Sequence, residues 1–371
     1  MATKHIVILG AGAVGSSIAY FLSQKAPQGL KVTVIEKTGI ACAASGKAGG
    51  FLARDWCTLP IGEASFKLHA ELAEKLDGAN KYGYRRVRTY SAVFSQQKKR
   101  KIEKSHSGGL AWCSPAAIGS VQELADENDS AQVHPGQYTH TVLEAAKKTG
   151  IVDVRIGQGV SALVYDDSQK CVTGVQLEDQ QVVEADAVVV CMGPWSGQLP
   201  LKKRLPISAA RAHSIVYQLA DPGSIPAEAI FTEMRTRHGA SSPEVYPRPD
   251  GTVYMCGATD DEPLPDSADK IQLNETNIET LLESGALVSD LLVSENVVAK
   301  QACYLPLARD GDPLIGAHPA FEQLYVAAGH SCWGILNSPI TGRMMAELLI
   351  DGKISCVPSS AVKAVDPTSR L

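Results

Sequence analysis

The stretch Ile6-Val7-Ile8-Leu9-Gly10-Ala11-Gly12-Ala13-Val14-Gly15 decides the fold of this 371-residue chain. Its apolar start predicts a buried strand, and apolar residues recur at helical spacing after the glycines, so the glycines lie in a strand-to-helix turn. Gly10 permits the tight turn, Gly12 lets a pyrophosphate approach the backbone at the helix N-terminus, and Gly15 allows close helix packing. The stretch therefore predicts a dinucleotide site.

A second strand supports this prediction. Val32-Thr33-Val34-Ile35 ends in Glu36 and Lys37, about twenty residues after the last glycine. An acid at this place can hold a ribose 2′-hydroxyl and would repel a 2′-phosphate, which favours FAD or NAD over NADP. The alternative is a chance run of small residues in a chain with 32 glycines. The strand, the helix and the acid in their expected places argue against it.

The other end of the chain distinguishes between the two dinucleotides. Asp310-Gly311-Asp312-Pro313-Leu314-Ile315-Gly316 precedes an apolar run and then Gly329-His330-Ser331-Cys332-Trp333-Gly334. These residues resemble the C-terminal segment that closes over the flavin in the D-amino-acid oxidase and glycine oxidase superfamily. The resemblance implies FAD, with backbone N–H groups of 329–334 facing the flavin carbonyl edge. His330 then need not be a catalytic base.

Further segments resemble the same superfamily in the same order. Ser45-Gly46-Lys47-Ala48-Gly49-Gly50 is similar to the loop that runs along the pyrophosphate toward the flavin ring. Ala187–Val190, followed by Gly193 and Trp195, is similar to the central strand and turn that contact the cofactor. Val160 is expected as another cofactor contact.

Two more segments refine the resemblance. Arg248-Pro249-Asp250-Gly251 is similar to the hairpin of the superfamily's substrate domain. Residues 45–53, with Trp56 and Cys57, are most similar to a fungal group of FAD-dependent oxidoreductases whose substrates are not settled.

Hydrophobic periodicity predicts a nucleotide-binding unit that the chain leaves and re-enters. The chain exceeds one typical core, and 44% hydrophobic residues can fill two. We expect an α/β Rossmann-type FAD-binding domain interleaved with an α+β substrate domain that contains a mainly antiparallel sheet. Asn274 is expected to cap a long substrate-domain helix. The expected FAD-binding segments are 1–83, 133–205 and 301–371, and the substrate-domain segments are 84–132 and 206–300.

Composition narrows the partners. The net charge is −5, and the basic cluster Lys98–Lys101 is interpreted as a solvated turn, so we expect no nucleic acid. No apolar run approaches the roughly twenty residues of a membrane helix, and the first strand begins close to Met1, so we expect neither a membrane span nor an N-terminal targeting peptide. Nine cysteines without a C-x-x-C pair, and histidines without metal spacing, argue against a disulfide framework and against a metal site.

The flavin would supply the redox chemistry, so few catalytic side chains are needed and none is assigned. In amino-acid oxidases of the superfamily, an arginine before a proline pairs with the substrate carboxylate. Here that position is Leu305. This departure weakens the prediction of a simple α-amino-acid substrate, unless Arg54, Arg211 or Arg309 takes over the carboxylate. Each of these arginines is otherwise a surface or ion-paired residue. Tyr246 and Trp333 complete the candidates for substrate contact.

Two further positions bear on the flavin. Members similar to sarcosine oxidase place a lysine near the flavin in the strand after the hairpin, and Met255 is expected there instead. Reaction with oxygen is not excluded, because other members lack that lysine. Cys303 aligns loosely with the cysteine that those members attach to the flavin ring, but an isolated cysteine beside a strand is usually buried packing. We expect no covalent attachment.

The residues Ser369-Arg370-Leu371 resemble the Ser-Lys-Leu peroxisomal address. Pro358, Ser359, Ser360 and Pro367 are expected to make the tail flexible enough for an import receptor. Peroxide-forming oxidases of this superfamily often carry such termini. We expect a peroxisomal protein if the address is read, and a cytoplasmic one otherwise.

Together these observations predict an FAD-dependent oxidoreductase that oxidises a C–N bond of an amine or amino-acid-like substrate to an imine, with oxygen as acceptor and hydrogen peroxide as product. One alternative is a flavin dehydrogenase with a different acceptor, which slow reoxidation in air would distinguish. Another is a flavin-binding regulatory or trafficking protein with little catalysis, which no amine would reduce. A bare NAD-dependent dehydrogenase would not need the C-terminal segment.

Overall fold

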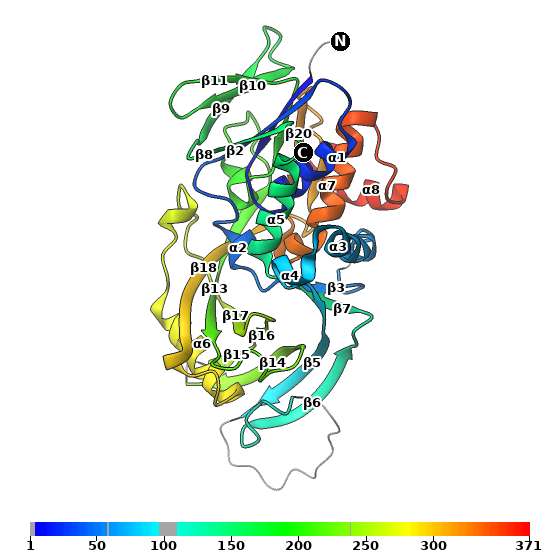
Figure 1. Cartoon of the computed structure of the whole chain (residues 1–371). Coiled ribbons are helices and arrows are strands. Elements are labelled where there is room, and N and C mark those ends of the chain that lie inside the picture. Colours follow the sequence, from blue (N-terminus) through cyan, green and yellow to red (C-terminus); the bar gives the residue numbers. More distant parts are fainter. Residues whose placement is uncertain (1–3, 58, 96–109, 238) are drawn as a thin grey trace.

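Figure 1 shows the computed structural model of the chain, which describes residues 4–57, 59–95, 110–237 and 239–371. The basic cluster Lys98–Lys101 lies outside the described residues. One large sheet occupies the upper half of the view and another the lower half.

The upper sheet has the strand order β19-β20-β12-β1-β2-β8 and is parallel except at its edge strand β19. β1 is apolar because both of its faces are buried: Ile6 and Ile8 enter one core, and Val7 and Leu9 enter another. The strands are β1 (Lys4–Leu9), β2 (Leu30–Glu36), β8 (Val152–Ile156), β12 (Ala187–Val190), β19 (Leu314–Ala317) and β20 (Leu324–Ala328).

Helices cover one face of this sheet, and a small antiparallel sheet covers the other. Apolar residues recur at helical spacing near 65–76, near 138–148 and after Gly334, and these segments form α3, α5 and α7. The helices are α1 (Ala13–Lys25), α3 (Gly62–Leu76), α4 (Gly78–Tyr82), α5 (Pro135–Lys147) and α7 (Gly334–Asp351), and the small sheet holds β9 (Val160–Tyr165), β10 (Val172–Leu177) and β11 (Val182–Glu184).

The lower sheet has the order β18-β13-β17-β16-β14-β5-β6, with β15 beside β14. Its pairs are antiparallel except β14 with β5, which confirms a mainly antiparallel sheet. The strands are β5 (Arg88–Phe94), β6 (Ile118–Ala125), β13 (Ile207–Gln218), β14 (Glu228–Thr236), β15 (Gly239–Ser241), β16 (Glu244–Pro247), β17 (Thr252–Asp260) and β18 (Val297–Ala308).

One helix, α6 (Glu275–Val288), packs on the outer face of the lower sheet. Asn274 caps it as predicted, because its side chain accepts hydrogen bonds from the N–H groups of Thr276 and Asn277.

The connections between the two units show the interleaving. β3 (Phe51–Ala53), β4 (Arg85–Arg86) and β7 (Ser130–Gln132) form a small sheet of their own, which the sequence did not predict. The predicted border between residues 300 and 301 falls inside β18, which pairs with β13 from Val297 to Ala308. The whole of β18 therefore belongs to the lower sheet, including residues 301–308.

The expectation of a flexible tail is wrong. After α7 the chain forms α8 (Ser359–Val365) and a 3-10 turn at Pro367–Ser369, and Ala361 and Val365 are fully buried. Arg370 then binds Asp310, with Nε 2.7 Å from Oδ2, while its Nη1 donates to the Pro313 carbonyl at 2.8 Å. Apolar residues at helical spacing within 359–365 could have predicted this packed helix, and the prediction from the sequence did not use them.

Candidate active site

A cavity of about 900 Å³ runs from the upper sheet to the inner face of the lower sheet. It begins at the carboxyl ends of β1, β2, β12 and β20, where ligands of open parallel sheets bind, and it ends among β13, β16, β17 and β18. This volume lies at the upper end of the range for small-molecule sites. We refer to its two ends as the nucleotide half and the substrate half.

The glycine turn forms the floor of the nucleotide half. Gly10 has φ of +107°, and a Cβ there would lie 2.6 Å from the Cys191 carbonyl oxygen. A Cβ on Gly12 would lie 2.9 Å from Ser45 Oγ, which itself accepts the Ala13 N–H at 2.9 Å. Gly12 begins α1 without a side-chain cap. Apart from the Ala13 N–H, which Ser45 accepts, backbone N–H groups at the start of this helix can therefore bind a diphosphate, which a side chain at Gly12 would exclude.

Glu36 closes the nucleotide half at the end of β2. Its carboxylate accepts the backbone N–H groups of Ala11 and Thr38, each at 2.9 Å, and it lines the cavity. These hydrogen bonds fix the carboxylate where the sequence expects a ribose contact, and that contact stays a prediction. Beside it, Lys37 Nζ lies 2.7 Å from Glu178 Oε1.

Most predicted cofactor residues line this cavity, although they come from six separate segments. A dinucleotide fits the arrangement because the glycine turn, the acid and the closing loop all face one space. The lining residues among them are Gly10, Gly12, Ala13, Val14, Glu36, Lys37, Ser45, Ala48, Gly49, Val160, Gly193, Trp195, Gly329, His330, Ser331, Cys332 and Gly334.

The other predicted cofactor residues lie behind the lining. A Cβ on Gly15 would lie 2.0 Å from the Gly10 oxygen, so Gly15 serves the helix packing expected of it. Gly46 and Gly50 make comparably close backbone contacts, to Ala41 and Val133. Lys47 does not line the cavity as expected, because its Nζ donates to the Ala302 carbonyl at 3.1 Å, next to Cys303.

Trp333 was expected to contact both the cofactor and the substrate, and the structure places it elsewhere. It packs against the helix-covered core of the upper sheet and does not line the cavity.

Strand alternation decides which side chains enter the substrate half. On β16 and β17, Glu244 pairs with Cys256 and Tyr246 with Tyr254, and these four share one face. Val245 and Met255 take the opposite face, fully buried in the core that includes α6 residues. The expectation that Met255 meets the flavin is therefore wrong by one residue: Tyr254 and Cys256 line the cavity instead.

Glu244 brings an acid into the substrate half, which sequence reasoning missed. Tyr246 Oη donates to Glu244 Oε2 at 2.5 Å, and Cys256 Sγ lies 3.7 Å from the same oxygen. Burial raises the pKa of Glu244 above its usual value, although both hydrogen bonds oppose the shift. Burial raises the pKa of Cys332, and the charge of Glu244 adds to this shift. Glu244 and the 329–334 loop line the same cavity. The alternation of polar Glu244 with apolar Val245 was the sequence pattern that could have predicted that Glu244 lies on the face opposite to the core.

Tyr246 supports this wall from behind. It does not line the cavity, and its ring stacks between Phe51 and Tyr254 with centroid distances of 5.6 and 6.2 Å. A Cβ on Gly49 would lie 2.4 Å from the Tyr246 ring, so only glycine lets the 48–50 backbone pass so close. Tyr246 therefore orients Glu244 and packs beneath the loop.

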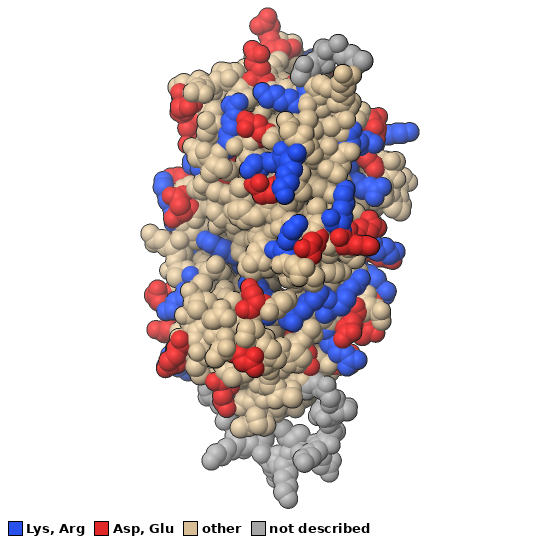
Figure 2. Space-filling view, in the orientation of Figure 1, with Lys and Arg blue, Asp and Glu red and all other residues tan. Residues whose placement is uncertain are grey.

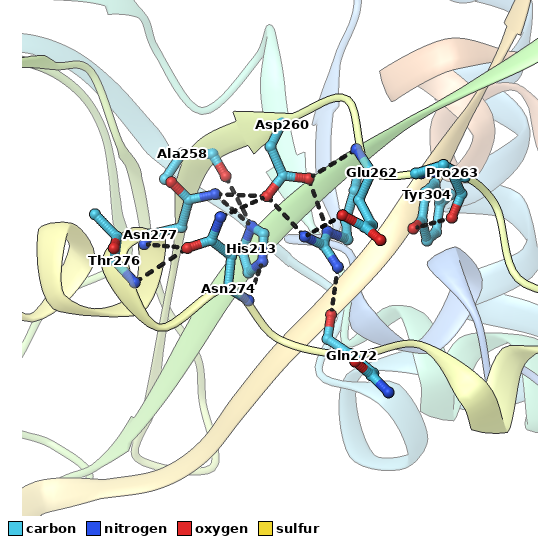
Figure 3. Close-up of polar contacts among 11 residues, drawn as sticks. His213, Ala258, Asp260, Glu262, Pro263, Gln272, Asn274, Thr276, Asn277 and Tyr304 are labelled. Carbon is cyan, nitrogen blue, oxygen red and sulfur yellow. Dashed lines mark hydrogen bonds and ion pairs between the residues drawn. The ribbon is translucent and has the colours of Figure 1, made fainter.

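The predicted arginines do not reach the cavity, and Arg211 shows why most directly. Its Nε lies 2.7 Å from Asp260 Oδ1 and its Nη2 2.9 Å from Oδ2, a bidentate pair. Figure 3 shows the network around Asp260, which also accepts from Asn274 and Asn277 at the start of α6. Arg211 thus ties α6 and its preceding loop to β13, and its guanidinium is occupied.

The other two arginines lie at the surface. Arg54 Nη1 pairs with Asp129 Oδ1 at 2.8 Å and keeps 41% of its side chain exposed. Arg309 is exposed on the turn after β18. Neither lines the cavity. The prediction that one of the three binds a substrate carboxylate has no support in the structure, because each guanidinium is placed elsewhere.

The histidines of the cavity are held neutral. Burial lowers the pKa of His330 to about 4, and its Nε2 lies 3.1 Å from Thr341 Oγ1. His213 Nε2 accepts the Asn274 N–H at 3.0 Å, so Nδ1 carries the proton toward the Ala258 carbonyl. Neither imidazole is poised as a base.

Leu305 and Cys303 both line the substrate half, next to each other on one face of β18. Leu305 thus places an apolar side chain where an arginine was expected. Burial raises the pKa of the Cys303 thiol to about 11, which disfavours the reactive thiolate.

Surface and ligand features add two observations. On the face drawn in Figure 2, Lys and Arg side chains stand among Asp and Glu side chains. Within the described ranges, no helix is both long and apolar enough to span a bilayer, and no cluster of three or more metal-ligating side chains occurs.

Comparisons with known proteins agree with this geometry. A family model described as FAD dependent oxidoreductase matches residues 5–348. A Schizosaccharomyces pombe protein named as an oxidoreductase is 33% identical over 392 residues, which cover 100% of this chain and 99% of the relative. TDA3 of Saccharomyces cerevisiae, which is also named as an oxidoreductase, is 27% identical, and the match covers 98% of this chain and 94% of TDA3. The predicted fungal resemblance is confirmed.

A solved structure supports the fold. Glycine oxidase from Geobacillus kaustophilus superposes with a TM-score of 0.78 and 19% identity, covering 100% of both chains. The predicted interleaved architecture is therefore found in a known structure.

Proposed function

The chain belongs to the DAO family of FAD-dependent oxidoreductases, and from this premise we propose that it oxidises the C–N bond of an amine or amino-acid-like substrate to an imine, with oxygen as acceptor. One observation carries the proposal: a single cavity joins a dinucleotide cradle to a chamber that contains a carboxyl group and no neighbouring nucleophile–base pair. Such a chamber suits removal of hydrogen from a carbon that bears a basic nitrogen.

FAD would lie along the cavity. The start of α1 would hold the diphosphate, Glu36 the ribose, and the 329–334 loop the ring. FAD supplies the redox chemistry by accepting two electrons and a hydrogen from the substrate carbon. The chain's own residues bind and orient the substrate, exclude water and receive the proton of the amine.

In the oxidation step, the substrate carbon loses a hydrogen together with the electron pair of the C–H bond. The nitrogen loses a proton, and its lone pair completes the C=N bond. Water then hydrolyses the imine to a carbonyl compound and an amine. Reoxidation by one oxygen molecule gives one hydrogen peroxide.

An anaerobic screen tests the proposal. FAD-loaded protein is mixed anaerobically with primary, secondary and N-methyl amines and amino acids, and loss of the visible absorbance of oxidised flavin is followed. We expect at least one amine to bleach the flavin, and air to restore the colour with close to one peroxide per flavin. Bleaching with little peroxide would favour a dehydrogenase, and no bleaching by any compound would favour a flavin-binding protein with little catalysis.

Location is a separate proposal. Ser369, Arg370 and Leu371 would be read by a peroxisomal import receptor only after Arg370 leaves Asp310, because a receptor needs an accessible peptide.

A further inference from the structure

Glu244 is the chemically unusual group of the substrate half, and it sets the charge of the ligand that can enter. We propose that Glu244 binds the substrate through a cationic amine, and that the preferred substrate carries no carboxylate on the reacting carbon. This inference rests on the proposed amine oxidation and names its substrate class.

The charges that line the cavity are unevenly distributed. Lys37 pairs with Glu178 at 2.7 Å, and Lys270 lies 3.3 Å from Asp266. Lys37 follows β2, and Asp266 and Lys270 belong to the loop whose Pro265 carbonyl accepts from Trp195 Nε1 at 2.6 Å, beside the end of β12, so both pairs lie in the nucleotide half. Among the described lining residues, Glu244 is then the charged group of the substrate half. No lysine or arginine of the described residues lines this half. Lys47 lies behind the lining, where its Nζ donates to the Ala302 carbonyl at 3.1 Å beside Cys303, so the charged group that a substrate carboxylate would meet at the cavity surface is an acid.

One arginine approaches the same wall without entering it. Arg248 is 6% exposed, its Nη2 donates to the Ala48 carbonyl at 3.2 Å, and its guanidinium carbon lies 5.0 Å from the centre of the Tyr254 ring. Tyr254 lines the cavity and Arg248 does not. The Tyr254 ring therefore separates this cation from the substrate half.

The contacts of Glu244 leave a site for an ammonium group. Its described hydrogen bonds, from Tyr246 and Cys256, both end on Oε2, so Oε1 can accept an N–H from a ligand. Leu305 and Ala212 line the same half and add apolar surface. In such surroundings an unpaired carboxylate is costly, and a cationic partner relieves that cost.

Proton transfer follows from the same contact. An ammonium ion has no lone pair on nitrogen, so it must lose a proton before its C–H bond is broken. Burial raises the pKa of Glu244, which brings it closer to that of an amine and makes it a better proton acceptor. The carboxylate takes one proton, the hydrogen and its electron pair leave the carbon for the flavin, and a protonated imine remains.

The first experiment measures recognition without turnover. Tetramethylammonium, which has neither an N–H nor a lone pair, is titrated into FAD-loaded protein and followed by the change in flavin absorbance. Glu244→Gln should weaken its binding at least ten-fold, because the replacement keeps the size and removes the charge. Glu233→Gln, the same change on an exposed residue of β14, is the matched control and should leave the dissociation constant unchanged.

The second experiment compares matched substrates in the unaltered protein. Phenylalanine and phenethylamine, ornithine and putrescine, and glycine and methylamine are mixed anaerobically with the holoenzyme. Wherever a pair reduces the flavin, the decarboxylated amine should be at least ten-fold faster at equal concentration. This comparison stands even if Glu244→Gln fails to fold or to retain FAD.

The outcomes separate the two proposals. Reduction by amino acids at rates equal to or above those of their decarboxylated partners, or an unchanged tetramethylammonium affinity in Glu244→Gln, would overturn the role of Glu244 and leave amine oxidation intact. If none of these compounds and none of the secondary and N-methyl amines of the wider screen reduces the flavin, amine oxidation itself is overturned, whatever the affinity for tetramethylammonium.

Discussion

At the scale of single residues, Cys303 is the clearest test of how burial sets reactivity. With a pKa of about 11, its thiol is ionised at pH 7 to about one part in ten thousand, and the thiolate is the form that attacks a flavin ring. Acid precipitation should therefore release the FAD into the supernatant. Cys303→Ser should retain the flavin content and spectrum of the unaltered protein. Colour that stays in the pellet and disappears in the variant would show covalent attachment.

The cavity residues show what a sequence can specify at this scale. The glycine turn and Glu36 were predictable, because their roles depend on backbone geometry within one short segment. Arg211 was not, because its partner Asp260 is brought opposite by strand pairing between β13 and β17. A side chain's charge is visible in the sequence, whereas its partner is a property of the fold.

At the scale of elements, α3 and α7 are joined by a buried histidine. His69 Nε2 donates to the carbonyls of Ile335 and Leu336 in the first turn of α7, at 3.0 and 3.1 Å. The ring is neutral, and burial lowers its pKa to about 4. This contact fixes the helix whose N-terminus follows the closing loop.

The neutral His69 makes the stability of the fold depend on pH. In the unfolded chain His69 has a pKa of about 6.5 and takes up a proton below that pH, while in the folded chain it does so only near pH 4. The free energy of unfolding should therefore fall as the pH falls through this window. His69→Gln should make the fall shallower by up to about 1.4 kcal/mol per pH unit in urea titrations. The exposed His140→Gln is the control, and equal slopes in both variants would contradict the assignment.

Elements also show where sequence periodicity stops being informative. The long helices α3, α5 and α7 were predictable because many turns repeat one apolar face. On β17 the alternation of side chains between two faces was predictable, but which face lines the cavity was not. Met255 was therefore expected in the cavity, where the structure has Cys256. A strand with polar and apolar residues on both faces needs its neighbours to decide which face is inner.

At the scale of the whole molecule, the docked tail makes a prediction about location. Asp310→Asn removes a charge that holds Arg370 and should free the last residues. With a fluorescent protein fused at the N-terminus, the peroxisomal fraction of Asp310→Asn should exceed that of the unaltered chain, and deletion of Leu371 should abolish it. A diffuse signal in all of these proteins would contradict the proposed address.

The central strand β1 also has a consequence for synthesis on the ribosome. Its neighbour β12 pairs Ala187 with Ile6, so one edge of β1 has no partner strand until about 180 further residues have been synthesised. At typical elongation rates that wait lasts roughly 10–40 s. Over that interval a row of apolar side chains and unpaired amide groups is open to other nascent chains. Newly made protein should therefore depend on chaperones far more than its finished, closed form suggests.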